Sequence, residues 1–124
     1  MTKEILLIDD DEDELEVFTQ ALHSIDKTIK CSLAKNLTDA LEFLSYCSPA
    51  YIFIDFNMPK VNGLECLPEI KKLNKLEKSR IVLYSNHISE EMNETATAMG
   101  VYRCVKKPNM TAELVKKIKE ILKS

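Results

Sequence analysis

The sequence predicts an α/β fold: a (βα)5 unit in which five strands form a doubly wound, five-stranded parallel sheet. Three observations predict it. Short apolar runs rich in β-branched residues recur along the chain, segments with helical spacing of apolar residues lie between them, and three of the runs are apolar at every position. Strands that alternate strictly with helices through short connections favour a parallel sheet with helices on both faces.

The five expected strands are short. The apolar runs lie at residues 5–8, 29–33, 51–54, 81–84 and 102–105. The first, third and fourth runs contain no charged residue and do not alternate with polar ones, so they cannot be strands with one face in water. We therefore expect these three to be buried parallel strands.

Segments between the runs carry apolar residues every three or four positions, which places those side chains on one face of a helix. In chain order, the repeating positions are Leu15, Phe18, Leu22 and Ile25; Leu37, Leu41 and Leu44; Met92, Ala96 and Met99; and Leu114, Ile118, Ile121 and Leu122. Ser89 is expected to cap the fourth helix and Gly100 to end it. Asn109 or Thr111 is expected to cap the fifth.

The third helix is less regular than the others. It follows Gly63, but Pro68 stands several residues further on. A proline inside a helix removes one backbone hydrogen bond. We therefore expect this helix to begin late or to bend.

Size and charge narrow the class of protein. A length of 124 residues suits one domain, so we expect a single domain over residues 1–124 that folds alone, with no effector domain attached. Seventeen Lys and Arg against twenty Asp and Glu give a net charge of -3, which argues against nucleic acid or an anionic membrane as the main partner. No apolar run approaches the roughly 20 residues of a membrane span.

The cysteines and the start of the chain indicate the cytoplasm. The cysteines form no CxxC pair and have no histidine at metal-ligand spacing, so we expect small apolar side chains in or near a core. They are Cys31, Cys47, Cys66 and Cys104. The first residues lack the long apolar core and the cleavage site of a signal peptide. A reducing, cytoplasmic environment follows as the expectation.

Chemically active residues follow the expected strands. The first strand leads into Asp9 and Asp10, the third into Asp55, the fourth into Ser85 and the fifth into Lys107. In open parallel sheets, ligands bind beyond the carboxyl ends of the strands. We therefore expect carboxylates, a hydroxyl and an amine to meet on one rim of the sheet.

Three carboxylates on one rim predict a cation. Asp9, Asp10 and Asp55 would repel one another, which raises their pKa values or demands a positive ion between them. Oxygen ligands without His or Cys favour a hard ion, and Mg²⁺ is the expected cofactor. The acidic residues 11–13 have a different interpretation, because their charges suit the positive end of a helix dipole in solvent.

Four motifs in this order resemble the receiver domain of two-component response regulators. They are IDDDED at the first strand end, IDFNMPKVNGLE around Asp55, LYS at Ser85 and KKP at Lys107. The family's spacing after Asp55 is matched by Met58, Pro59 and Gly63. The resemblance covers the whole chain and implies the flavodoxin-like strand order 2-1-3-4-5 that chemotaxis receivers have.

The resemblance implies a role for each acidic residue on the rim. Asp55 becomes the phosphoacceptor. Asp10 and Asp55 ligate Mg²⁺ through carboxylate oxygens, Asp9 acts mostly through water, and the backbone carbonyl of Asn57 supplies a further ligand. Positions for water or a phosphoryl oxygen stay open on the metal.

The same resemblance implies the reaction and the partners. Asp55 attacks the phosphorus of a phosphohistidine, carried by a sensor histidine kinase or a histidine phosphotransfer protein, and the Lys107 ammonium neutralises charge in the transition state. Ser85 and Lys107 then move toward the phosphoryl group and carry their loops with them. Such a protein catalyses only its own phosphorylation and dephosphorylation, and its output is the binding of a downstream protein or the passage of the phosphoryl group onward in a relay.

Two positions depart from the pattern of the family. Asn86, directly after Ser85, stands where a small residue is usual, and its bulk is expected to restrict the approach of a donor or of water. Cys104, three residues before Lys107, stands where the family carries an aromatic ring that turns inward on activation. Tyr102 is two residues before Cys104, so we expect both to share one face of the strand, and activation to be reported by Tyr102 or by loop motion alone.

Two other functions fit part of the pattern. The first is a pseudo-receiver that binds partners without being phosphorylated. The second is a hydrolase like the haloacid dehalogenases, because Asp9 and Asp11 form a DxD motif at a strand end, although Asp13 stands where that family has threonine. Phosphate turnover separates the three: none for a binding module, many cycles for a hydrolase and slow single phosphorylation for a receiver.

Overall fold

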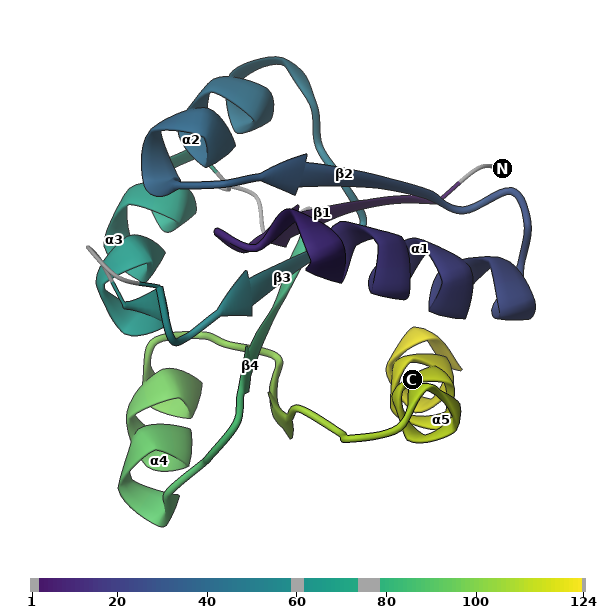
Figure 1. Cartoon of the computed structure of the whole chain (residues 1–124). Helices are drawn as coiled ribbons and strands as arrows, with labels where there is room; N and C mark the ends of the chain where they lie inside the picture. The colour runs from purple at the N-terminus through teal and green to yellow at the C-terminus, as the bar shows by residue number, and fades with distance from the viewer. Residues whose placement is uncertain (1–2, 59–61, 74–78, 124) are drawn as a thin grey trace.

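Five strands and five helices alternate along the chain in the computed structural model, which describes residues 3–58, 62–73 and 79–123 (Figure 1). They are β1 (Glu4–Ile8), α1 (Glu12–Ile25), β2 (Lys30–Ala34), α2 (Leu37–Tyr46), β3 (Tyr51–Asp55), α3 (Gly63–Leu73), β4 (Arg80–Ser85), α4 (Glu90–Ala98), β5 (Arg103–Lys106) and α5 (Thr111–Lys123). All strand pairs are parallel and the order is β2-β1-β3-β4-β5. The predicted fold class and strand order are confirmed.

The three runs without alternation are the inner strands of the sheet. β1, β3 and β4 are buried along almost their whole length, whereas β2 and β5, at the two edges, are only partly buried. A parallel strand in the middle of a sheet has helices over both faces, so every side chain must be apolar. This is why the runs at 5–8, 51–54 and 81–84 read as continuous.

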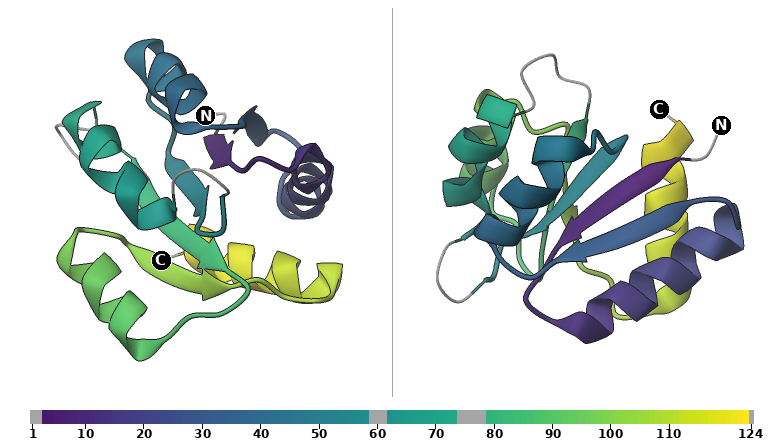
Figure 2. Two further views of the ribbon diagram at one scale, coloured as in Figure 1. Left: turned by 60° about the vertical axis from the view of Figure 1, so that its left-hand side comes forward. Right: turned by 90° about the horizontal axis from the view of Figure 1, so that it is seen from above.

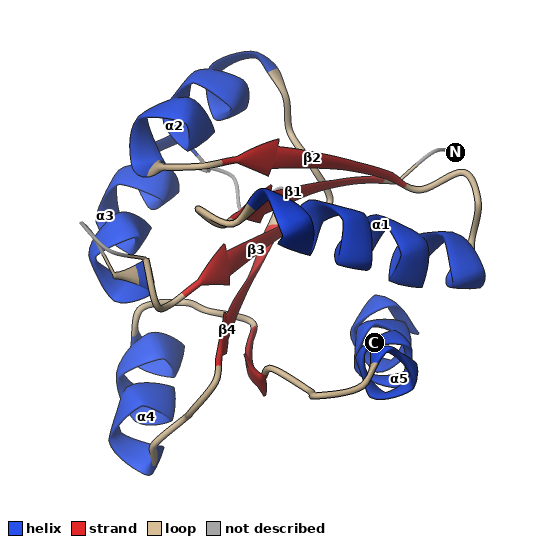
Figure 3. Ribbon diagram, viewed as in Figure 1, coloured by secondary structure: helices blue, strands red, loops and turns tan. Residues whose placement is uncertain are grey.

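Alternation along each inner strand builds two cores. Leu7 and Phe53 face α1 and α5, whereas their neighbours Leu6 and Ile52 face α2, α3 and α4. Figure 2 and Figure 3 show this division of two helices on one face of the sheet and three on the other. Burial of one such side chain stabilises the fold by about 1.5–3 kcal/mol, so β1, with four inaccessible apolar residues, anchors both layers.

The helix boundaries follow the expected caps in α4 but not in α5. The Ser89 hydroxyl accepts a hydrogen bond from the Met92 amide (3.0 Å), and Gly100, at φ +92°, reverses the chain after α4. The expected cap of α5 is wrong. That helix begins at Thr111 itself, and the amides of Glu113 and Leu114 donate to the carbonyl of Met110.

Of the two alternatives for α3, the late start is excluded, because the helix begins at Gly63 and continues through Pro68, while a bend stays a prediction. Two reciprocal hydrogen bonds hold the first turn ahead of the proline: the Asn62 side chain accepts from the Glu65 amide (2.9 Å) and donates to the Glu65 carboxylate (2.8 Å). Pro68 cannot donate to the carbonyl of Leu64. The buried apolar face of α3 offsets that single lost bond.

The helices are short. They contain between 9 and 14 residues. Within the described ranges, none of them has the length and apolar character that crossing a membrane requires.

Gly63 lies where α3 meets the sheet, and its lack of a side chain permits this approach. A Cβ at this position would lie 2.5 Å from the Leu83 Cδ1 atom and 3.1 Å from the Phe56 Cα atom. The leucine methyl can move, but the backbone of Phe56 continues from the end of β3. Close contact at Gly63 therefore sets the distance between helix and sheet beside Asp55.

We predict that Gly63→Ala lowers the free energy of unfolding by about 1–2 kcal/mol, because overpacking costs more than the helix propensity of alanine returns. Urea denaturation measures the change. Glu69→Ala on the same helix is the control, since the contact of Glu69 within the described residues is an exposed ion pair with Lys72, and it should change the value by less than about 0.5 kcal/mol. Equal stability of Gly63→Ala and the parent protein would contradict the packing argument.

Candidate functional site

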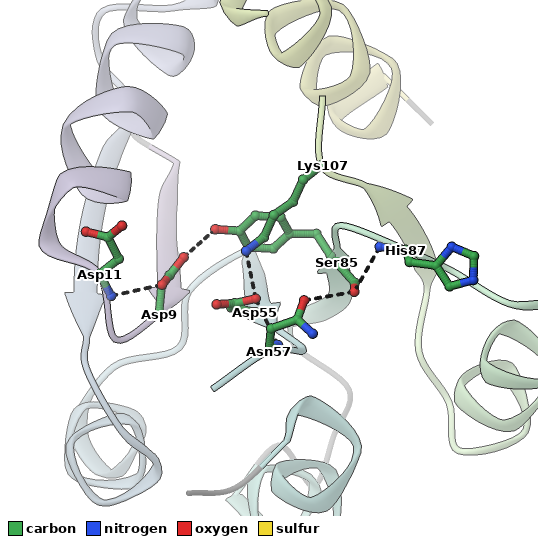
Figure 4. Close-up of polar contacts among 8 residues, drawn as sticks. Asp9, Asp11, Asp55, Asn57, Ser85, His87 and Lys107 are labelled. Carbon is green, nitrogen blue, oxygen red and sulfur yellow. Dashed lines mark hydrogen bonds and ion pairs between the residues drawn. The ribbon is translucent and has the colours of Figure 1, made fainter. Parts of the chain in front are cut away.

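The polar residues that follow the strands meet at one rim of the sheet, as expected. Asp9 follows β1, Asp55 ends β3, Ser85 ends β4 and Lys107 follows β5. The sheet places these ends next to one another because the strands are parallel and in register; Asp55 pairs with Tyr84. Figure 4 shows their side chains converging from the different strand ends.

The three carboxylates of the predicted metal site form one cluster. Carboxylate oxygens of Asp9, Asp10 and Asp55 lie within 4.8 Å of one another. Asp9 and Asp55 are 1% and 3% exposed, whereas Asp10 is open to solvent. Negative charges at this spacing favour a cation, and a set of oxygen donors alone fits a hard ion such as Mg²⁺.

Asp9 is held by a hydrogen bond to each of its two oxygens. Oδ1 accepts from the Asp11 amide (3.0 Å), and Oδ2 accepts from the Tyr84 hydroxyl (2.6 Å). Burial raises the pKa of Asp9 to about 6, and the charge of Asp55 acts in the same direction, although both hydrogen bonds oppose the rise. The metal-free site therefore disfavours the ionised form of Asp9.

Among the residues that the structure describes, Lys107 makes a cationic contact with Asp55. The Lys107 ammonium lies 2.8 Å from Oδ1 of Asp55, with little exposure of either side chain. The amide of Asn57 donates to the same oxygen (3.0 Å). Neither contact uses Oδ2. The amide and side chain of Asn57 are thus engaged in the site, while a role of its carbonyl as metal ligand stays a prediction.

Ser85 is bonded to Asn57 rather than to Asp55 among the residues that the structure describes. Its hydroxyl donates to the Asn57 side-chain oxygen (3.0 Å) and accepts from the His87 amide (3.4 Å). The ring of His87 is exposed and directed away from Asp55 (Figure 4). Asn86 is exposed as well. In this state the hydroxyl is close to the site but held aside from it.

The acidic residues after Asp10 belong to the helix, as expected. Asp11 is the N-cap of α1, and its side chain accepts from the Asp13 amide (3.0 Å). Glu12 pairs with Lys35 at the surface. These carboxylates stabilise the amino end of α1 and do not join the metal cluster.

The expected shared face of Tyr102 and Cys104 is wrong. β5 begins only at Arg103, so strand alternation does not yet apply at Tyr102. Tyr102 packs on the α1 and α5 side of the sheet and Cys104 on the other side. The Tyr102 ring lies 4.6 Å from the guanidinium carbon of Arg80, at the start of β4, and therefore at the opposite end of that strand from Ser85.

The sequence interpretation missed Tyr84, which it took as one more apolar residue of a buried strand. Burial and the hydrogen bond to Asp9 raise the pKa of Tyr84, so its hydroxyl remains a donor. A signal was present, because a buried tyrosine usually needs a partner for its hydroxyl. Its partner lies 75 positions away in the chain, and only the folded sheet identifies it.

Solved structures share this fold along nearly the whole chain. The chemotaxis protein CheY4 of Vibrio cholerae superposes with a TM-score of 0.83 at 19% identity, over 97% of this chain and 98% of that one. The phosphorylated cyanobacterial phytochrome response regulator RcpA gives 0.83 at 23% identity, over 98% and 91%. At these identities the likeness shows the fold.

Sequence relatives point in the same direction. The transcriptional regulatory protein CpxR homolog of Haemophilus influenzae is 29% identical over 119 residues, which are 96% of this chain and 50% of the relative. The hybrid signal transduction histidine kinase C of Dictyostelium discoideum is 30% identical over 110 residues, 84% of this chain but 9% of the kinase. This chain thus spans half or less of the length of these two relatives.

A family model assigns the chain directly. The response regulator receiver domain model matches residues 5–119, which include every rim residue described above. The rim chemistry, the strand order and this match agree, and the chain belongs to the response regulator receiver domain family of two-component signalling.

Proposed function

We propose that residues 1–124 form a receiver domain that accepts a phosphoryl group on Asp55, with Mg²⁺, and signals through a change of conformation. The observation that carries the proposal is the 2.8 Å contact between Lys107 and Asp55 beside a cluster of carboxylates. A buried nucleophile, a cation and a set of oxygen ligands are the groups that phosphoryl transfer to a carboxylate requires.

The metal site in this proposal uses the residues of the cluster. Asp10 and Asp55 hold Mg²⁺ through carboxylate oxygens, the backbone carbonyl of Asn57 adds a ligand, and Asp9 acts through water. When bound, the ion supplies positive charge for the phosphoryl oxygens. Support comes from the spacing and the all-oxygen composition of the cluster.

The reaction in this proposal starts at Oδ2 of Asp55, because the contacts of Lys107 and Asn57 both use Oδ1. Oδ2 attacks the phosphorus of a phosphohistidine, the phosphorus–nitrogen bond breaks, and an acyl phosphate forms while the imidazole leaves with the electron pair. The Lys107 ammonium already lies against the carboxylate, so it can follow the charge onto the phosphoryl group. Catalysis consists of positioning and electrostatics.

The conformational change begins with Ser85. To reach a phosphoryl group on Asp55, its hydroxyl must give up the bond to Asn57. The Lys107 amide donates to the Ser85 carbonyl (2.7 Å), so the ends of β4 and β5 are tied together and move as a pair. The phosphoryl oxygens on Asp55 thus draw Ser85 toward them, and the two loops that follow β4 and β5 are displaced together.

The donor we propose is a sensor histidine kinase or a histidine phosphotransfer protein, and the phosphorylated domain signals by binding a downstream protein. A receiver-like segment within a hybrid histidine kinase supports this class of donor. The net charge of -3 argues against nucleic acid and anionic membranes as partners. All four cysteines are free thiols, the state that a reducing cytoplasm maintains, and we place the exchange there. Beyond its own phosphorylation and dephosphorylation we propose no enzymatic activity.

The alternative of an aspartyl-phosphate hydrolase loses support in this geometry. It needs the second carboxylate of the DxD motif at the site, but Asp11 caps α1 instead. A pseudo-receiver would lack one of the reactive groups, whereas Asp9, Asp55, Ser85 and Lys107 lie on one rim.

We predict that Asp55 takes up one phosphoryl group from acetyl phosphate only when Mg²⁺ or Mn²⁺ is present, because a cation must offset the clustered carboxylates. Intact-mass spectrometry detects the added phosphoryl group. Asp55→Asn and a sample in EDTA are the controls, and neither should gain mass. A mass shift in either control would refute Asp55 or the metal requirement; no shift in the parent protein would favour the pseudo-receiver.

We predict that Lys107→Ala keeps the fold but reduces the number of residues whose amide shifts respond to a phosphoryl group, because the cation that follows the new charge is gone. The measurement is the set of amide shifts that beryllofluoride induces. Lys106→Ala is the matched control, since Lys106 is the exposed neighbour in β5, and it should respond as the parent does. A response of Lys107→Ala as wide as that of the parent contradicts the role.

We predict that Asp9→Asn raises the free energy of unfolding of the metal-free protein by about 1–2 kcal/mol at pH 7.5. Burial raises the pKa of Asp9 from 3.8 to about 6, so the folded protein binds more protons than the unfolded chain between these values. Stability therefore falls as the pH rises through this window, and the whole loss is present above it.

Urea denaturation in EDTA between pH 4 and 7.5 measures the slope of the free energy of unfolding against pH. Asp9→Asn should reduce this slope and leave the smaller part due to Glu14, whose pKa is also raised by burial. Asp10→Asn, at the solvent-exposed position of the cluster, should retain the slope of the parent. An Asp9→Asn protein that is less stable than the parent at pH 7.5 would show that the carboxylate stabilises the metal-free fold.

A further inference from the structure

We propose that Tyr84 is a positioning residue of the phosphorylation site: its hydroxyl orients the Asp9 carboxylate and its ring supports the Lys107 ammonium. The inference rests on the proposed function, since both of these groups act on Asp55 and its metal. Tyr84 contacts a carboxylate, Asp9, and an ammonium, Lys107, on two sides of the nucleophile. Neither its place in a strand nor its apolar packing requires these two contacts.

Tyr84 is well anchored for such a role. It lies in β4 directly before Ser85 and pairs in register with Asp55 on β3. The side chain is 3% exposed, and its ring packs against Phe18 of α1, with ring centroids 5.3 Å apart. The body of the side chain thus belongs to the apolar core, while its hydroxyl reaches the acidic rim.

The hydroxyl restricts Asp9 to one orientation. Oδ2 accepts from Tyr84 and Oδ1 accepts from the Asp11 amide, so rotation of the carboxylate breaks at least one bond. In this orientation an oxygen of Asp9 lies within 4.8 Å of oxygens of Asp10 and Asp55. A phenol is also a neutral donor: it orients the carboxylate without adding a positive charge that would repel Mg²⁺.

The ring acts on the other side of the site. The Lys107 ammonium lies 4.7 Å from the centroid of the Tyr84 ring and 2.8 Å from Oδ1 of Asp55. An ammonium is attracted to the face of an aromatic ring, so the ring limits the positions of the Lys107 ammonium as long as no phosphoryl group attracts it. Lys107 is thereby held beside the nucleophile before any phosphoryl group arrives.

Two substitutions separate the two contributions. Tyr84→Phe removes the hydroxyl and keeps the ring, and Tyr84→Leu removes both. Tyr51→Phe is the matched control, because Tyr51 is also buried in the sheet but its hydroxyl donates to the carbonyl of Ile121 in α5 (3.3 Å), outside the site. Two-dimensional NMR spectra establish that each variant is folded.

The first readout is the dissociation constant of Mg²⁺ alone, from amide shifts of residues 9–11 during titration. Tyr84→Phe should bind Mg²⁺ roughly tenfold more weakly than the parent, as expected when a partner that orients a metal ligand is lost. Tyr51→Phe should bind it as the parent does. The second readout is beryllofluoride affinity at saturating Mg²⁺, which should stay near the parent value in Tyr84→Phe and fall in Tyr84→Leu.

The outcomes separate the inference from the proposed function. If the parent binds Mg²⁺ and is phosphorylated but Tyr84→Phe binds the ion equally well, the positioning role is overturned and the function stands. Equal Mg²⁺ loss in Tyr84→Phe and Tyr51→Phe also overturns it, since a general loosening of the sheet then accounts for the effect. If the parent itself binds no Mg²⁺, the proposed function falls and this inference falls with it. Where Tyr84→Leu does not fold, Tyr84→Phe decides alone.

Discussion

The concentration of negative charge at the carboxyl end of the sheet is the constraint on which the rest of this structure depends. Asp9 and Asp55 are almost inaccessible, and their strands β1 and β3 are direct neighbours, so the two carboxylates cannot separate. Ionised carboxylates at such positions are costly unless donors or cations surround them. Backbone amides, the Tyr84 hydroxyl and the Lys107 ammonium supply part of this compensation, and a divalent cation is suited to supply the remainder.

The apolar sheet below makes this arrangement rigid. β1 is inaccessible over Ile5–Ile8 and packs against helices on both faces, which fixes the height at which Asp9 leaves the core. Register matters equally, because Asp55 lies opposite Tyr84, and a shift of one residue would turn each side chain to the other face. The close approach of Gly63 to the end of β3 adds a third constraint on Asp55.

In the proposed mechanism, the path from phosphorylation to conformational change differs from the one that the resemblance to the family implies. Cys104 is too small to act as an aromatic lever, and Tyr102 lies at the other end of β4 from Ser85. The direct tie between the reactive loops is the hydrogen bond from the Lys107 amide to the Ser85 carbonyl. In the proposed mechanism, this hydrogen bond makes the ends of β4 and β5 move as a pair. The displacement of the backbone then transmits the signal, in place of the inward-turning aromatic ring of the family pattern.

The sequence by itself determined the fold class, the inner strands and the identity of the rim residues, because continuous apolar runs and the residues that end them are local patterns. Its expected cap of α5 was wrong, since that helix begins at Thr111, directly after Met110. It also left two alternatives for α3, and the structure excludes the late start, because hydrogen bonds between Asn62 and Glu65 hold a first turn ahead of Pro68. Only the tertiary structure decided that Tyr84 serves Asp9 and that Tyr102 does not share a face with Cys104. Both depend on contacts between strands distant in sequence, and on where a strand begins, which no periodicity within one segment contains.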